Sequence, residues 1–234
     1  MTAELRVPEP HQTAPVRALR VLTVRWWLLS VRQLTEAFVA LVLLLLVSPV
    51  LVAVAVAVKL SGPGPVLFRQ ERLGLHRRGF RIIKFRTMAD GNSDEIHRRY
   101  VRRLLTEDAP PDGGQAGVYK LAADPRVTRI GGFLRRTSLD ELPQLWNVVR
   151  GELSLVGPRP VLAWEAELFP EGAERRFTVR PGITGLWQIS GRSTVDYRAA
   201  LELDVRYAQT KSLWLDLWIL ARTVVVVLDR SVAR

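Results

Sequence analysis

An uncharged apolar stretch from Ala37 to Val58 constrains this chain more than any other feature of its sequence. As one helix it would be roughly 33 Å long, enough to cross the hydrocarbon core of a bilayer. Ser48 and Pro49 stand at its centre, where proline removes a backbone N–H and clashes with a carbonyl one turn earlier. Each half alone would reach only about 16 Å, or one leaflet. The sequence therefore predicts a membrane-embedded segment with a break at Ser48-Pro49.

Positive charge flanks the apolar stretch on both sides. The flanking basic residues are Arg20, Arg25, Arg32, Lys59, Arg69 and Arg72. Because positive charge marks the cytoplasmic side, the pattern favours a re-entrant helix-break-helix that enters and leaves by one face. A helix that spans the membrane remains the alternative, since proline kinks are tolerated in such helices. We expect a disordered and interfacial segment at 1–33, the re-entrant helix at 34–60 and a cytoplasmic domain at 61–234.

Composition narrows the chemistry. The net charge is +11 and the pI is about 11.0, which indicates an anionic partner: nucleic acid, acidic lipid headgroups or a phosphorylated substrate. The chain has no cysteine, which excludes disulfides, a thiolate nucleophile and cysteine metal sites. With three scattered histidines, a zinc centre is not expected, so any metal would be a hard cation held by oxygen ligands.

The domain after the apolar stretch is expected to be α+β, mostly helical with a small β-hairpin. Two short strands are predicted at 66–70 and 80–86, joined by a basic turn at 74–79. Lys84 and Arg86 lie one side-chain period apart, so both would face the same way and reach phosphate together. Equally, they could be the charges of a solvated edge strand.

The C-terminal stretch at 212–228 pairs Trp214 with Trp218 at helical spacing. We expect an amphipathic helix that lies in the membrane interface. A core helix of the domain is almost as well supported by the pattern.

Asp140 and Glu141 are adjacent carboxylates between arginines. Ser138-Leu139-Asp140-Glu141 matches a capping box with Ser138 as the helix cap. Pro143 favours Asp140 as the cap instead, because its missing N–H then falls among the free donors of the first turn. A purely structural role for Asp140, as a helix cap, therefore remains an alternative.

The same pair also suits phosphoryl transfer. Neighbouring residues of a helix point about 100° apart, so the two carboxylates suit separate tasks, one as nucleophile and one as metal ligand. Arg135 and Arg159 would hold the negative charge that spreads over a transferring phosphoryl group. A carboxylate beside arginines stays ionised and ready to attack phosphorus.

Five segments of the chain, in this order, carry a family resemblance: Lys84-Phe85-Arg86-Thr87-Met88, Asp124-Pro125-Arg126-Val127-Thr128-Arg129, Thr137-Ser138-Leu139-Asp140-Glu141-Leu142-Pro143-Gln144, Leu155-Val156-Gly157-Pro158-Arg159-Pro160 and Arg180-Pro181-Gly182-Ile183-Thr184-Gly185-Leu186-Trp187-Gln188. They closely resemble the bacterial sugar transferase family, the monotopic polyprenyl-phosphate phosphoglycosyltransferases. The likeness extends roughly from Leu34 to Leu228. It favours the hairpin interpretation, because the family's re-entrant helix carries a Ser-Pro break.

The resemblance implies an enzyme that transfers a sugar 1-phosphate from a nucleoside diphosphate sugar to polyprenyl (undecaprenyl) phosphate. The product would start exopolysaccharide or other surface-glycan synthesis at the cytoplasmic face of the bacterial plasma membrane. The segment from Trp187 to Arg192 looks more like members that use UDP-glucose or UDP-galactose than those that use N-acetylated sugars. Membrane lipids, and a second copy of the chain in a homodimer, are further expected partners.

The family's site residues carry over to matching positions of this sequence. Asp140 is implied to be the nucleophile that forms a covalent phosphosugar, and Glu141 to help hold Mg²⁺. Arg135 and Arg159 match arginines that face the phosphates, and Arg192 matches one near the donor nucleotide. Asp204 matches an acidic residue of the active site, although an aspartate on a helix surface fits the pattern nearly as well.

The rival interpretation is a non-catalytic basic scaffold, anchored to the membrane, that binds anionic lipids and uses Asp140 as a helix cap. Under that hypothesis Asp140→Asn retains function, because asparagine caps as well as aspartate. Nucleic acid is not an expected partner, since no recognised binding motif accompanies the charge.

Overall fold

The computed structural model describes residues 16–89, 98–99, 101–103, 126–191 and 196–228, with side chains from residue 31 onward. The chain forms two compact units, Met1–Thr35 and Glu36–Arg234. Of the first unit, the structure describes the beginning of helix α1 (Val16–Leu60). The remaining description concerns the second unit, which holds the rest of α1 and every later element.

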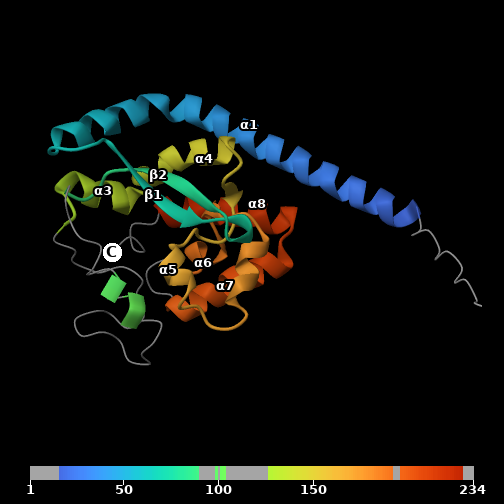
Figure 1. Cartoon of the computed structure of the whole chain (residues 1–234). Coiled ribbons are helices and arrows are strands. Elements are labelled where there is room, and N and C mark those ends of the chain that lie inside the picture. Colours follow the sequence, from blue (N-terminus) through green and yellow to red (C-terminus); the bar gives the residue numbers. More distant parts are fainter. Residues whose placement is uncertain (1–15, 90–97, 100, 104–125, 192–195, 229–234) are drawn as a thin grey trace, which may run out of the picture. The chain divides into compact units, whose positions relative to one another are not determined.

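Helix α1 continues through Pro49 without interruption, so the predicted helix break at Ser48-Pro49 is corrected to a bend within one helix. Its ribbon curves over this stretch in Figure 1. The hydroxyl of Ser48 donates a hydrogen bond of 2.8 Å to the carbonyl of Leu45. That carbonyl is the one that Pro49 leaves without its helical partner, and the serine satisfies it so that the helix need not end.

From Ala40 onward, one side of α1 packs against the later elements of the second unit. Two core clusters combine its residues with later elements: Ala40 with Leu145, Val148 and Leu153, and Val54 and Val58 with Phe85 and Leu134. The other side is exposed and apolar. Within the described residues, Val31–Leu60 is the one helical segment long and apolar enough, by length and composition, to cross a membrane.

The predicted hairpin is confirmed. Strand β1 (Leu67–Leu73) pairs antiparallel with β2 (Gly79–Phe85), and the short 3-10 turn η1 (Leu75–Arg77) joins them. β1 begins one residue later and ends three residues later than expected, and β2 is shifted by one residue toward the N-terminus, which is the usual uncertainty of element ends. Lys84 therefore lies at the end of β2, opposite Phe68.

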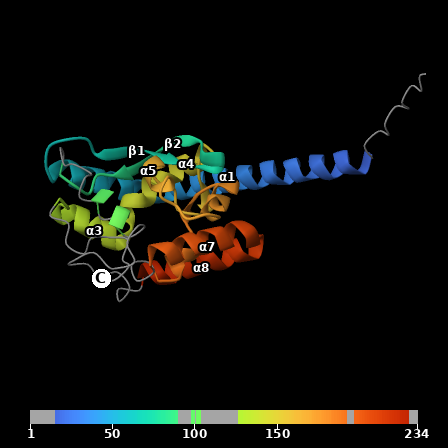
Figure 2. The same cartoon turned by 60° about the horizontal axis from the view of Figure 1, so that its bottom comes forward.

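The remaining elements are short helices and one small parallel ladder. They are α3 (Arg129–Thr137), η2 (Leu139–Gln144), α4 (Leu145–Val149), β3 (Ser154–Val156), α5 (Ala163–Ala166), η3 (Ala173–Thr178), β4 (Gly182–Thr184), α6 (Leu186–Ile189), α7 (Tyr197–Thr210) and α8 (Leu213–Leu228). β3 pairs with β4, and α7 lies beside α8 (Figure 2). The α+β, mostly helical class is confirmed for the described residues.

A close backbone contact fixes the segment that carries Arg159. A Cβ at Gly157 would collide with the carbonyl of Arg180 and the backbone nitrogen of Gly182, so only glycine fits between these strands. Farther along, Leu73 donates a backbone hydrogen bond of 2.8 Å to the carbonyl of Val161. Arg159 is thereby held between the β3–β4 ladder and the end of β1.

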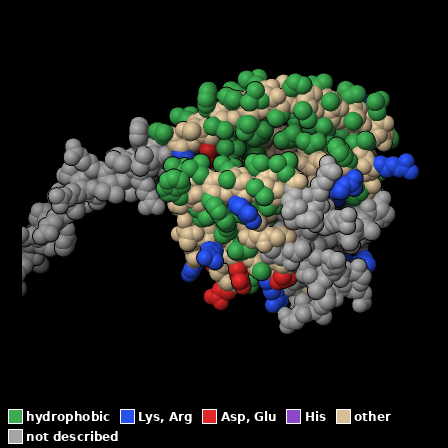
Figure 3. Space-filling model, turned by 180° about the vertical axis from the view of Figure 1, so that it is seen from behind, with side chains coloured by type: hydrophobic (Ala, Val, Ile, Leu, Met, Phe, Trp, Pro, Cys, Tyr) green, Lys and Arg blue, Asp and Glu red, His purple; other side chains and the backbone are tan. Residues whose placement is uncertain are grey.

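Helix α8 has one buried side and one exposed apolar side. Ile219 and Val226 are buried in a core cluster with Tyr207 of α7. Trp214 and Trp218 lie on the exposed side, 82% and 51% accessible. Together with the apolar side chains of α1, these residues supply much of the exposed hydrophobic surface. Figure 3 shows hydrophobic side chains gathered over the upper part of one face, with most charged side chains below them.

Candidate active site

Asp140 and Glu141 lie in the first turn of the 3-10 helix η2. Ser138 has a left-handed backbone conformation (φ 56°), which ends α3 and begins η2 at Leu139. The side chain of Ser138 makes no capping hydrogen bond, so the capping box is not formed. Asp140 stands one residue inside the turn, and its assignment as the cap is corrected. Adjacent residues of a 3-10 helix point about 120° apart, which keeps the two carboxylates in separate directions.

Glu141 is held by two cations from distant segments. Its Oε1 atom lies 2.6 Å from Nζ of Lys84 and 3.5 Å from Nη1 of Arg159. Burial lowers the pKa of Lys84, and the charge of Arg159 lowers it further, whereas the charges of Glu141 and Asp140 oppose the shift. Lys84 therefore lies within the electrostatic influence of both carboxylates. The structure brings Lys84, Asp140, Glu141 and Arg159 together.

Arg135 approaches from α3. Its Nε atom donates a hydrogen bond of 2.9 Å to the hydroxyl of Thr87, two residues beyond the end of β2. Gly131 makes this possible, because a Cβ there would collide with the backbone of Thr87. Helix α3 is thus packed directly onto the segment that follows Lys84, which brings Arg135 to the chain next to the site.

Arg86 has different partners from Lys84. Its guanidinium is buried and donates to the carbonyl of Val58 at 3.0 Å, to that of Gly62 at 2.8 Å and to that of Pro63. These carbonyls belong to the end of α1 and the turn after it, where helical carbonyls lack partners. Strand alternation placed Arg86 with Lys84, but in the structure it caps the membrane-type helix.

Asp204 is buried, and Arg176 links it to the backbone of Arg159. Arg176 donates from Nη2 to Oδ2 of Asp204 and to the backbone carbonyl of Arg159, both at 2.5 Å. The guanidinium of Arg176 also faces the rings of Phe169 and Phe177. Asp204 is therefore not the surface aspartate that one interpretation expected. It positions Arg159 through Arg176.

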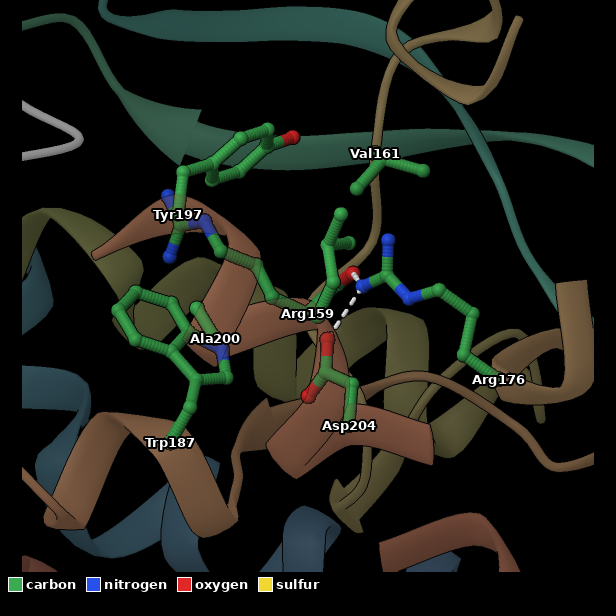
Figure 4. Close-up of a pocket in the computed structure, with 8 residues that line it drawn as sticks. Arg159, Val161, Arg176, Trp187, Tyr197, Ala200 and Asp204 are labelled. Carbon is green, nitrogen blue, oxygen red and sulfur yellow. Dashed lines mark hydrogen bonds and ion pairs between the residues drawn. The ribbon is translucent and has the colours of Figure 1, made fainter. Parts of the chain in front are cut away.

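Burial raises the pKa of Asp204 to about 6, and the charge of Arg176 opposes this rise without cancelling it. The ion pair adjoins a cavity behind Arg159 (Figure 4). Its walls are formed by Arg159, Val161, Arg176, Trp187, Tyr197, Ala200, Leu201 and Asp204. The cavity brings aromatic rings next to the buried ion pair.

Sequence reasoning missed Arg176 as a site residue, and also Gln144 and Arg72, which line a second hollow beside the carboxylates. Gln144 follows Glu141 by three residues, so on a 3-10 helix the two side chains stand above one another. Only knowledge of the helix type gives that signal.

Arg192 lies outside the described residues, and its predicted role near the donor stays a prediction. Ser48 and Pro49 lie within α1, which continues through them.

The oxygen donors at the pair fit Mg²⁺. Mg²⁺ is commonly bound by one or two carboxylates together with substrate phosphates, rather than by a complete protein cage. Glu141 and its neighbour Asp140 supply such a partial set, and Lys84 and Arg159 both contact the Oε1 atom of Glu141. Among the residues whose positions are given, no group of three acidic or histidine side chains forms a metal site. A cation here would thus depend on ligands from the substrate.

Two adjacent carboxylates, one of them held by a lysine and an arginine, form a centre suited to phosphorylated ligands, here on an α+β domain packed against a membrane-type helix. The chain belongs to the bacterial sugar transferase family, whose sequence profile matches residues 27–230. The match includes every described residue of the centre.

Curated relatives support the same family. The chain is 45% identical over 192 residues to the UDP-galactose-lipid carrier transferase of Erwinia amylovora, which covers 82% of this chain and 39% of that protein. It is 40% identical over 215 residues to the exopolysaccharide production protein ExoY of Rhizobium meliloti, covering 92% and 89%. It is 39% identical over 201 residues to the UDP-glucose:undecaprenyl-phosphate glucose-1-phosphate transferase of Escherichia coli, covering 82% and 39%. The chain thus spans less than half of two of these relatives and most of the third.

Proposed function

We propose that this chain transfers a sugar 1-phosphate from a UDP-sugar to polyprenyl phosphate, with Asp140 as the nucleophile. The observation that carries the proposal is the cluster in which Lys84 and Arg159 hold Glu141 next to Asp140. Family membership and the names of the relatives supply the substrate classes.

In the first half-reaction a carboxylate oxygen of Asp140 attacks the β-phosphorus of the donor. The bond from that phosphorus to the bridging oxygen breaks, and UMP leaves with the bond's electron pair. The sugar phosphate is then held on Asp140 as an acyl phosphate. Arg159 and Lys84 stabilise the negative charge that collects on the departing phosphate.

In the second half-reaction an oxygen of polyprenyl phosphate attacks the same phosphorus. The bond to Asp140 breaks and the carboxylate is regenerated, so atoms and charges balance over the cycle. Both half-reactions use one carboxylate and one cationic cradle, which avoids assembling two separate centres. Glu141 is the residue that would hold Mg²⁺. When bound, the ion would neutralise charge on the diphosphate oxygens.

We further propose that the protein is monotopic and faces the cytoplasm. The packing of α1 against the domain from Ala40 to Val58 supports this, because these residues extend over roughly 27 Å of helix. A helix that crosses the bilayer upright would be surrounded by lipid over much of that length. It would then lose these contacts with a domain that lies in water. The exposed tryptophans of α8 suit the headgroup layer of the same face.

The donor sugar is proposed to be glucose or galactose. The Erwinia relative is named for UDP-galactose and the Escherichia relative for UDP-glucose. The product would begin a surface glycan, in line with the ExoY relative's name as an exopolysaccharide production protein.

The test is UMP release from a panel of UDP-sugars in the presence of Mg²⁺ and undecaprenyl phosphate, with purified protein in nanodiscs. We expect release by the wild type with one hexose preferred, and loss of at least about 1,000-fold in Asp140→Asn, because an amide is a poor nucleophile. Arg150→Gln, which changes an exposed side chain, is the matched control. Equal release by wild type and Asp140→Asn would remove Asp140 from this role.

A further inference from the structure

A small hollow lies beside the carboxylate pair, distinct from the cavity behind Arg159. It is enclosed by the β1–β2 hairpin, η2, the segment after Arg159 and β4. Its lining residues are Arg72, Ile82, Lys84, Gln144, Arg159, Pro160, Gly182 and Ile183. The hollow is too small for a sugar ring and is of the size that receives an oxygen atom or a water molecule.

Three cations converge on this hollow. Lys84 and Arg159 are shared with the carboxylate centre, and Arg72 is added from β1. Glu141 offsets part of the charge, and Glu165 lies 3.7 Å from Arg72 on the other side. The lining itself carries three positive side chains and no acidic one, so it favours an anionic oxygen.

Two buried donors in the lining have no hydrogen-bond partner among the described residues. One is the amide Nε2 of Gln144, whose residue is only 2% exposed, and the other is Nε of Arg72. The other nitrogens of Arg72 are engaged with the carbonyl of Pro160 and with Oε1 of Gln70. A buried donor without a partner destabilises the fold, so such groups usually mark a ligand or an ordered water.

We propose that Arg72 and Gln144 form a subsite for the phosphate that leaves in the first half-reaction and for the one that attacks in the second. The inference rests on the proposed function and adds two residues to its machinery. Each residue donates one hydrogen bond to a phosphate oxygen that enters the hollow, while Lys84 and Arg159 hold the charge between this oxygen and the carboxylates.

One subsite can serve both phosphates because each displacement is in line. The bridging oxygen leaves on the side of the phosphorus opposite Asp140. When polyprenyl phosphate displaces Asp140, its oxygen must enter from that same side. The phosphate of UMP and the phosphate of the lipid therefore occupy one position in turn, and a fixed pair of donors can bind either.

The experiment measures binding of UMP, uridine and farnesyl phosphate to the full chain in micelles by titration calorimetry. Gln144→Leu removes the amide at nearly constant volume, and Arg72→Lys keeps the charge but loses the Nε donor. Gln209→Leu and Arg69→Lys are matched controls, since both side chains are exposed, and Arg69 lies on the same strand as Arg72. Melting temperatures show which variants are folded.

We expect Gln144→Leu and Arg72→Lys each to weaken UMP and farnesyl phosphate by about tenfold, with uridine and both controls unchanged. UMP should also compete with farnesyl phosphate on the wild type. Unchanged binding of both phosphates by folded variants would overturn the subsite, and weakening of only one would overturn its shared use. These results are separable from the proposed function, which fails instead if the wild type binds UMP but releases none from any UDP-sugar.

Discussion

Nζ of Lys84 lies 2.6 Å from Oε1 of Glu141, although the two residues come from a strand and a 3-10 turn 57 positions apart. Arg159 reaches the same oxygen from a third segment. The carboxylate pair is therefore built by long-range packing, in which β2, η2 and the Arg159 segment must all be in place. Its properties should depend on the charge balance of the cluster more than on any one member.

Lys84→Met and Glu141→Gln should each destabilise the protein by about 2 kcal/mol, because each removes the short ion pair and leaves a mostly buried charge with a weaker counterion. The double variant removes both charges of the pair, so its loss of stability should be clearly smaller than the sum of the losses in the two single variants. A double-mutant cycle on melting temperature and denaturant midpoint measures this coupling. Additive losses would show that the ion pair contributes nothing to the fold. UMP release should be lost in all three variants.

Asp204→Asn should alter how stability depends on pH. The pKa of Asp204 is 3.8 unfolded and about 6 folded, so the native state binds the proton more tightly. Protonated Asp204 therefore contributes to the free energy of unfolding, by roughly 3 kcal/mol at most, and this contribution is fully present below pH 3.8. It is lost as the pH rises to about 6. Asparagine does not titrate. Measured from pH 4 to pH 7, the stability of Asp204→Asn relative to wild type should rise and level off above pH 6.

A relative stability that stays constant across this range would contradict the buried, proton-binding state of Asp204. Arg206→Gln, on the exposed side of the same helix, is the control and should follow the wild type at every pH. If Asp204 positions Arg159 through Arg176, Asp204→Asn should also raise the KM for the UDP-sugar more than Arg206→Gln does.

Arg86→Gln should act on stability and not on phosphate binding. Arg86 donates to three carbonyls at and after the end of α1, and losing these bonds in a buried place should cost about 2–3 kcal/mol. We expect a lower melting temperature with an unchanged affinity for UMP. Arg81→Gln, an exposed arginine of the preceding strand β2, is the control. A selective loss of UMP affinity at normal stability would restore the phosphate-binding role that strand alternation indicated.

The sequence predicted what depends on local patterns. The hairpin follows from two short apolar runs around a glycine-bounded turn, and the carboxylate pair, Lys84 and Arg159 follow from motifs with recognisable chemistry. Asp204 also came from the resemblance, although its working contact is with Arg176.

The parts that escaped prediction depend on contacts between distant segments. The left-handed backbone conformation of Ser138 sets the start of η2, and the residue type serine does not predict that conformation. Arg86 follows the strand alternation that would place it with Lys84, but the unsatisfied carbonyls at the end of α1 attract it. Gln144 and Arg176 have no local signal, since each becomes significant only when η2 or η3 is packed beside Arg159.

The side of the membrane reached by each end of the apolar stretch can be measured with cysteine labels, because the chain has no cysteine of its own. We place one label at Ser30→Cys before the stretch and another at Arg69→Cys after it. For a monotopic protein, an impermeant maleimide should modify both in inverted vesicles and neither in intact cells. Pro49→Ala restores the missing N–H and favours a straight helix by up to about 3 kcal/mol. A straight α1 would not hold both of its packing clusters, so a fraction of Pro49→Ala chains should expose Ser30→Cys to the outside. Pro65→Ala changes a proline beyond the helix and is the control, which should not expose it. Labelling of the two positions from opposite sides in the otherwise native chain would establish a spanning helix instead.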